Sequence, residues 1–252
     1  AVLRIDQGEL LVLKKILKDD LPLSMPWKRA LNAVNNEWVT WAKLDNRKLS
    51  WDWHIQPLAP MKTLSSLLSQ NTILMLTNLG QSDSFFLDLN SKKFSFTVKV
   101  NLGNKLEQEP IPLFVPKRQP LPNTAHFYRH ILSQCQRLIL TRTHATIILV
   151  DDVQLRLQLT SELAGEFGLR VAHETTNIEV NGIICCSCDW WISNQYNLPT
   201  PDQLIFPLIP LPTLESPWTA AKVEMLRHQG REWFREFLLP ETVTTLLKSL
   251  SI

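Results

Sequence analysis

Short apolar runs recur through the second half of the chain and predict buried strands. Two of them, Thr146–Val150 and Ile183–Cys186, are of strand length, and a third, Leu204–Phe206, stops at Pro207. Continuous apolar strands separated by crossovers are typical of parallel sheets with both faces covered, whereas half-exposed strands alternate polar and apolar residues. The pattern therefore predicts an α/β fold in which helices flank a parallel sheet.

Segments with helical periodicity follow these runs. Thr124 is placed to cap a helix that continues to about Leu140, and Asp152 to cap a helix that ends at Gly168. The connection around Trp190 is predicted to be polar and irregular. The remaining predicted helices cover residues 26–34, 58–70, 215–229, 231–238 and 240 onward, and the remaining predicted strands cover residues 72–77, 94–100, 111–115 and 169–173.

The first 57 residues predict an appendage to this sheet. Residues 7–20 place four apolar side chains on one helical face with three lysines opposite, which indicates an amphipathic packing helix. Residues 36–44 and 49–57 predict a β-hairpin, and Trp51 and Trp53 alternate with polar residues in its second strand. Such tryptophans could stack nucleobases. We favour a hydrophobic contact that fixes the hairpin to the main domain, because tryptophans at alternate positions usually point inward.

Composition limits the class of protein. The 252 residues carry a net charge of +2, and this balance does not by itself indicate a nucleic-acid partner. No apolar run approaches the roughly 18 residues of a membrane span, and no signal peptide is visible, so no membrane partner is expected. The seven glycines are too dispersed to form a phosphate-binding loop. Because the sequence starts at Ala1 in an amphipathic stretch, we expect a fragment of a longer polypeptide.

Two groups of residues resemble metal ligands in type only. Cys185, Cys186 and Cys188 are close in sequence, but the first two alternate faces within a strand and a second ligand pair is missing. Buried thiols that act as small hydrophobic side chains are the preferred interpretation. Four cysteines without a disulfide framework also favour a reduced, cytoplasmic setting. His126 and His130 are four residues apart but lack the motif of a helical zinc site, so no metal is predicted.

The clearest electrostatic feature is an acid-free stretch between Pro110 and Val150, which contains no Asp or Glu. Its cations are Lys117, Arg118, Arg129, Arg137 and Arg142. A basic run of this length can follow a phosphate backbone. It can also be a solvated helix face that acids elsewhere in the fold balance. Cations scattered over unrelated faces would remove the main support for nucleic-acid binding.

Three passages carry a family resemblance. Trp190 follows the strand Ile183–Cys186, and a Leu-Pro pair follows at Leu198. The passage LFVPKRQPLPN begins at Leu113 and precedes a helix, while residues 230–243 keep a glycine, two phenylalanines and a second Leu-Pro pair. Together these passages resemble the C-terminal RecA-like domain of the DinG/XPD-type superfamily 2 DNA helicases, with degenerate motifs.

The resemblance implies ATP-dependent 5′-to-3′ unwinding of DNA, with ATP bound between two motor domains. Thr77 matches the first residue of the motif that couples the nucleotide site to DNA in that family. Where the family has acidic and glycine residues after the tryptophan, this chain has Trp191 and Ile192, and Asp151 and Asp152 replace hydroxyl residues that face the nucleic acid. The chain also ends where the arginines that reach the γ-phosphate are expected. No catalytic residue is therefore assigned.

The resulting hypothesis divides the chain at residues 57 and 58. Residues 1–57 are the end of a helical insertion plus a return hairpin, and residues 58–252 are the RecA-like domain. The chain would be the C-terminal motor-like half of a helicase without ATPase activity of its own. It holds no cofactor itself, and ATP and Mg²⁺ enter only if an upstream helicase domain, in a longer chain or a partner, completes the motor. The alternative is a non-catalytic nucleic-acid-binding or protein-interaction domain. The expected contacts to single-stranded DNA are Thr77, Lys117, Arg118, Arg129 and Trp190.

Overall fold

The computed structural model describes residues 2–5, 9, 12, 15, 38–45, 50–60 and 111–250. The chain divides into two compact units, residues 1–95 with 211–241 and residues 96–210 with 242–252. Thr77 and most of the helices and strands predicted between residues 26 and 34 and between residues 58 and 100 lie outside the described residues. The predicted domain boundary after residue 57 stays a prediction.

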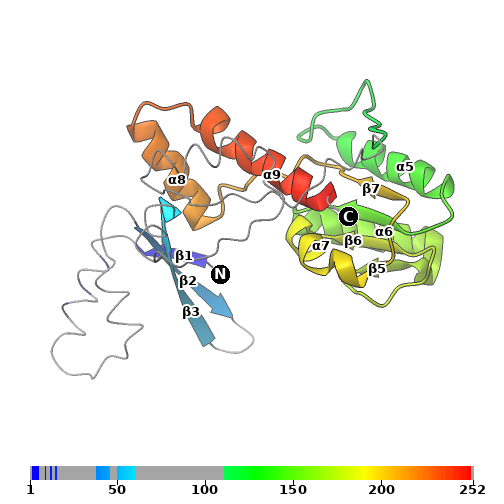
Figure 1. Ribbon diagram of the computed structural model, residues 1–252, viewed down its shortest axis with the longest axis horizontal. Coiled ribbons are helices and arrows are strands. Elements are labelled where there is room, and N and C mark those ends of the chain that lie inside the picture. Colours follow the sequence, from blue (N-terminus) through cyan, green and yellow to red (C-terminus); the bar gives the residue numbers. More distant parts are fainter. Residues whose placement is uncertain are drawn as a thin grey trace, which may run out of the picture. The chain divides into compact units, whose positions relative to one another are not determined.

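A four-stranded parallel sheet forms the centre of the second unit (Figure 1). Its strands are β4 (Thr146–Leu149), β5 (Val171–His173), β6 (Ile183–Cys186) and β7 (Gln203–Ile205), in the order β5-β6-β4-β7. The two central strands, β4 and β6, are fully buried, as their continuous apolar sequences require. The α/β class and the RecA-like arrangement of a parallel sheet with flanking helices are confirmed.

Helices cover both faces of this sheet. Helices α5 (Phe127–Leu140) and α6 (Val153–Phe167) pack on one face, where they bury Ile148 and Cys185. Helix α7 (Cys188–Asn194) packs on the other face with Cys186. The neighbouring thiols Cys185 and Cys186 therefore point to opposite layers, as the strand pattern predicted.

Three local expectations need correction. Helix α5 begins at Phe127 and not at Thr124, because the Thr124 hydroxyl donates to the Leu121 carbonyl in the preceding turn. Residues 111–115 form no strand, since two flanking prolines lack the N–H that a ladder needs. The connection after β6 is helical, because Ser187 caps α7 by accepting from the Trp190 N–H at 3.3 Å.

The first unit contains a three-stranded antiparallel sheet of β1 (Val2–Ile5), β2 (Trp38–Asp45) and β3 (Ser50–Pro57). Strands β2 and β3 form the predicted hairpin, whereas β1 was not expected. In the register of the hairpin Trp41 faces His54, and the two rings stack with their centroids 5.1 Å apart.

Helix α8 (Pro217–His228) packs on this sheet through the face that carries Val39 and Trp41. The Trp218 indole N–H donates to the Pro57 carbonyl at 3.0 Å and strengthens the contact. Trp53 pairs with Ala42 and lies on the face opposite Trp41, and the contact that is predicted for Trp51 and Trp53 stays a prediction. Hairpin register decides which alternate residues share a face, and the sequence of one strand does not reveal it.

The C-terminal part is helical, as predicted. A π-helical turn, Phe234–Leu238, leads directly into α9 (Leu239–Leu250). Near the start of the chain, Glu9, Val12 and Lys15 are helical and exposed, and they fall within the helix predicted over residues 7–20.

Candidate functional site at the carboxyl edge of the parallel sheet

The order of the strands defines where a ligand would be expected. Strands β4 and β6 are neighbours, but α6 leaves β4 towards one face of the sheet and α7 leaves β6 towards the other. In open α/β sheets such a switch point forms a crevice at the carboxyl ends of the strands, and ligands bind there. The residues that follow β4 and β6 are therefore the first place to look for chemistry.

Two aspartates follow β4, and both have structural partners. The Asp151 carboxylate accepts a hydrogen bond of 2.8 Å from the backbone N–H of Cys188, the first residue of α7, and so bridges the switch point. Asp152 accepts a hydrogen bond of 2.8 Å from the Leu155 N–H and caps α6. The predicted capping role of Asp152 is confirmed, and Asp151 has a bridging role that the sequence did not suggest.

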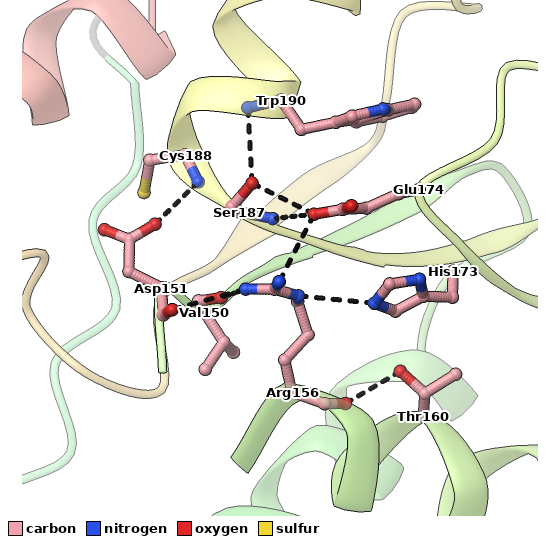
Figure 2. Close-up of polar contacts among 9 residues, drawn as sticks. All are labelled: Val150, Asp151, Arg156, Thr160, His173, Glu174, Ser187, Cys188 and Trp190. Atoms are coloured by element: carbon pink, nitrogen blue, oxygen red, sulfur yellow. Dashed lines mark hydrogen bonds and ion pairs between the residues drawn. The ribbon is translucent and has the colours of Figure 1, made fainter. Parts of the chain in front are cut away.

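Arg156, in the first turn of α6, joins the ends of strands β4 and β5 (Figure 2). Arg156 is only 7 % exposed to solvent. The guanidinium donates to the Val150 carbonyl at 2.7 Å and to the Asp151 carbonyl at 3.3 Å, both at the end of β4. It also donates to His173 Nε2 at 3.3 Å and lies 3.5 Å from a Glu174 carboxylate oxygen. The cation is thus fully engaged inside the chain.

Glu174 carries the network from Arg156 to β6 (Figure 2). Its Oε1 accepts from the Ser187 N–H at 3.2 Å and from the Ser187 hydroxyl at 3.0 Å. Its backbone adopts a φ of +44°, a left-handed conformation that is uncommon for residues other than glycine. Burial alone raises the pKa of Glu174, but the hydrogen bonds from Ser187 and the charge of Arg156 outweigh burial and hold the pKa below its ordinary value. Glu174 is therefore a carboxylate that the fold keeps ionised.

The two tryptophans of α7 have different surroundings. Trp190 is half-buried and packs against the apolar layer on the α7 side of the sheet. Trp191 is fully buried in that layer, and its indole N–H donates to the Ser249 carbonyl of α9 at 2.9 Å. The residue that replaces an acidic position of the resembling family is therefore a packing residue that holds α9.

This arrangement has a definite electrostatic consequence. The backbone N–H groups of Ser187 and Cys188, which could face an anion, already donate to the carboxylates of Glu174 and Asp151. The one cation of the network, Arg156, is buried, whereas Asp151 is exposed. Carboxylates at this edge repel phosphate groups. The N–H groups of Ser187 and Cys188 and the guanidinium of Arg156 are therefore not available to a phosphate at this edge.

The predicted basic residues lie elsewhere. Lys117 and Arg118 are exposed in the irregular segment before α5, and Arg129 is exposed on α5 itself. Arg137 lies eight residues later on the same side of that helix and is also exposed. Because α5 and Trp190 belong to opposite layers of the sheet, the structure does not bring the predicted cations and Trp190 together.

The thiols fit the predicted packing role. All four cysteines are free and buried. Burial raises the pKa of Cys135 to about 12 and that of Cys185 to about 11, so both remain neutral thiols near neutral pH. Within the described ranges, no three side chains of the metal-ligating kind come together.

Sequence reasoning missed the residues that organise this edge. Arg156 and Glu174 are single charged residues without a recognisable motif, and only the crossover of the chain brings them together. A second residue that the sequence did not single out is Phe114, which lies shortly before Lys117 and Arg118. It is 67 % exposed, whereas the predicted strand over residues 111–115 gave no reason to expect this exposure. Its position between two prolines was the available signal.

Comparison with known proteins adds no assignment. Neither the family models nor the curated proteins that were searched match this sequence. Among the described helices, none has the length and apolar character that crossing a bilayer requires.

Proposed function

We propose that this chain is the C-terminal motor-like half of a DinG/XPD-type DNA helicase and that it has no ATPase activity of its own. In this proposal the parallel sheet serves as a scaffold, and single-stranded DNA is the partner. Hydrolysis would need an upstream helicase domain that supplies the groups for ATP and Mg²⁺. The setting is reduced and cytoplasmic, in keeping with four buried free thiols.

The observation that carries the proposal is the occupied switch point. A RecA-like sheet would offer its strand ends to phosphates, yet here the carboxylates of Asp151 and Glu174 accept from the N–H groups of Cys188 and Ser187, and Glu174 pairs with the buried Arg156. A motor half that hydrolyses ATP must instead present donors and cations to the charge that develops during phosphoryl transfer. The internal carboxylates therefore support a half that contributes packing and binding and no catalysis.

The test is an ATPase assay on the purified chain with Mg²⁺ and single-stranded DNA, before and after a second purification. We expect hydrolysis no faster than in the buffer blank, and no saturable binding of a fluorescent ATP analogue. Activity that survives the second purification and is abolished by Asp151→Asn, in a variant whose circular dichroism is unchanged, would refute the proposal.

The alternative is a binding module unconnected to any motor, and one observation favours it. The ion pairs found in the described part of the chain include none of the five cations between residues 117 and 142. Such cations would bind nucleic acid whether or not a second motor half exists. Affinity for single-stranded DNA that is unchanged by adding nucleotide and Mg²⁺ favours the module, and nucleotide-dependent affinity in a longer polypeptide favours the motor half.

A further inference from the structure

An exposed aromatic residue and two cations occupy one short segment before α5. Phe114 is 67 % exposed and its neighbours Leu113 and Val115 are 87 % and 68 % exposed. Lys117 and Arg118 follow after Pro116 and are exposed as well. Single apolar residues on a surface are ordinary, but consecutive ones indicate an interaction site.

Helix α5, which follows this segment in the chain, carries further exposed cations. Arg129, Ser133 and Arg137 are exposed at intervals of four residues, so they lie in one row along the helix. At 1.5 Å per residue, the two arginines are about 12 Å apart along the axis. A row of this length reaches several phosphates of a nucleic-acid strand, whose charges in a duplex are about 3.4 Å apart along the axis.

An acid of the neighbouring helix contacts a different side of α5. Glu166 of α6 accepts a hydrogen bond from Gln136, which precedes Arg137 by one residue. Successive residues of a helix are about 100° apart around its axis, so Gln136 and Arg137 point in different directions. The other arginines of this unit are engaged, since Arg156 binds strand ends and Arg170 donates to the Asn181 carbonyl at 2.9 Å. The cations around α5 differ from these in facing solvent.

We propose that Phe114, Lys117, Arg118, Arg129 and Arg137 form a binding surface for single-stranded nucleic acid. Phe114 stacks on a base, and the four cations contact phosphates. The combination of an exposed aromatic ring with a row of cations is what non-sequence-specific single-strand binding uses, because each unpaired base offers a face to the ring. In a duplex the bases stack on one another, so a base would have to unstack before it could offer a face to the ring. This inference rests on the proposed function for its choice of a nucleic-acid partner.

The inference also changes the expected path of the bound nucleic-acid strand over the protein. Trp190 was the predicted stacking residue, but it is half-buried in the layer opposite α5 and stands beside the carboxylates of the occupied switch point. In this proposal the nucleic-acid strand follows α5 and does not contact the carboxyl edge of the parallel sheet. Phe114 replaces Trp190 as the residue that meets a base.

The experiment measures fluorescence anisotropy of a labelled 20-nucleotide oligothymidine with the full chain from 25 to 200 mM salt. Phe114→Ala should weaken binding about 5- to 150-fold, the range for loss of one stacked base, without changing the salt dependence. The double variant Arg129→Gln/Arg137→Gln should lower the slope of log affinity against log salt by about 1.4, because each phosphate contact to a single strand contributes about 0.7. Arg235→Gln, at an exposed arginine of the other unit, is the matched control and should change affinity less than twofold.

Trp190→Leu separates the two paths for the nucleic-acid strand, because leucine keeps an apolar side chain in the layer but offers no ring to a base. It should leave affinity within twofold, and binding that depends on Trp190 and not on Phe114 overturns the inference while the proposed function stands. No binding at 25 mM salt, or equal losses in Arg235→Gln and the double variant, also overturns the inference. If Phe114→Ala weakens binding to a duplex as much as it weakens binding to the single strand, Phe114 does not stack on an unpaired base. The ATPase result, which decides the proposed function, is independent of all these outcomes.

Discussion

Replacing Arg156 by methionine should destabilise the parallel-sheet unit more than any exposed arginine replacement in the chain. Methionine keeps the apolar stem of the side chain but removes every donor of the guanidinium. The carbonyl of Val150, the imidazole of His173 and the carboxylate of Glu174 then lose their shared partner. We expect the ends of β4 and β5 to separate from α6.

The magnitude follows from the burial and length of each contact. The bond of 2.7 Å to the Val150 carbonyl is buried, and a charged hydrogen bond of this kind contributes about 1.5–3 kcal/mol. The Glu174 side chain is 26 % exposed and 3.5 Å away, so solvent screening leaves about 1 kcal/mol for that pair. The longer contacts, of 3.3 Å, add about 0.5 kcal/mol each. The expected loss is about 3.5–5 kcal/mol, within the range for other buried charges that lose their partner.

Hydrogen exchange of the β4 and β6 amides in a urea series reports the stability of this unit alone. Arg129→Met is the matched control, because the same substitution on the exposed side of α5 should change the free energy of unfolding by less than about 0.5 kcal/mol. A loss below about 1 kcal/mol in Arg156→Met, or a loss equal to that of the control, would show that the network does not hold the strand ends together.

Three further predictions concern the same unit. Gly168 has a φ of +62° at the end of α6, so Gly168→Ala should lower the free energy of unfolding by about 1–3 kcal/mol. Gly165 lies inside the helix with open space around an added Cβ, so Gly165→Ala should raise the free energy of unfolding by about 0.5–1 kcal/mol in the same urea assay. Because the pKa of Glu174 is lower in the folded than in the unfolded chain, its contribution to stability is present above the unfolded value of about 4.3 and is lost as pH falls through the folded value; Glu174→Gln should flatten this acid limb, and an unchanged limb contradicts the assignment. The four buried thiols should react with a thiol reagent at pH 8 only after urea is added, and reaction of any one of them in the native chain contradicts their packing role.

The apolar runs were sufficient to predict the centre of the fold. The continuous sequences of β4 and β6 can only be buried on both faces, and this burial implies helices on either side. The capping of α6 by Asp152 was also predictable, because the cap lies within three residues of its partner. Both features depend on residues that are close together in the sequence.

The features that depend on distant residues were not predictable. Which face α5 and α7 cover depends on the crossover directions, so the separation of Arg129 from Trp190 was invisible in the sequence. The contacts of Arg156 with Glu174 and of Asp151 with Cys188 join residues 18 and 37 positions apart, and no spacing rule connects such pairs. Helix α7 was missed for a local reason, since a seven-residue helix is too short to show a clear period.

The bond between Trp191 and Ser249 has a consequence for synthesis of the chain. The parallel-sheet unit is discontinuous, because residues 211–241 belong to the other unit and separate its two pieces. The indole of Trp191 therefore waits for a carbonyl 58 residues downstream, which a ribosome adding about 5–20 residues per second supplies some 3–12 s later. During that interval α9 has not yet packed against α7. The apolar residues around Trp191 are then exposed and can bind a chaperone or a neighbouring nascent chain.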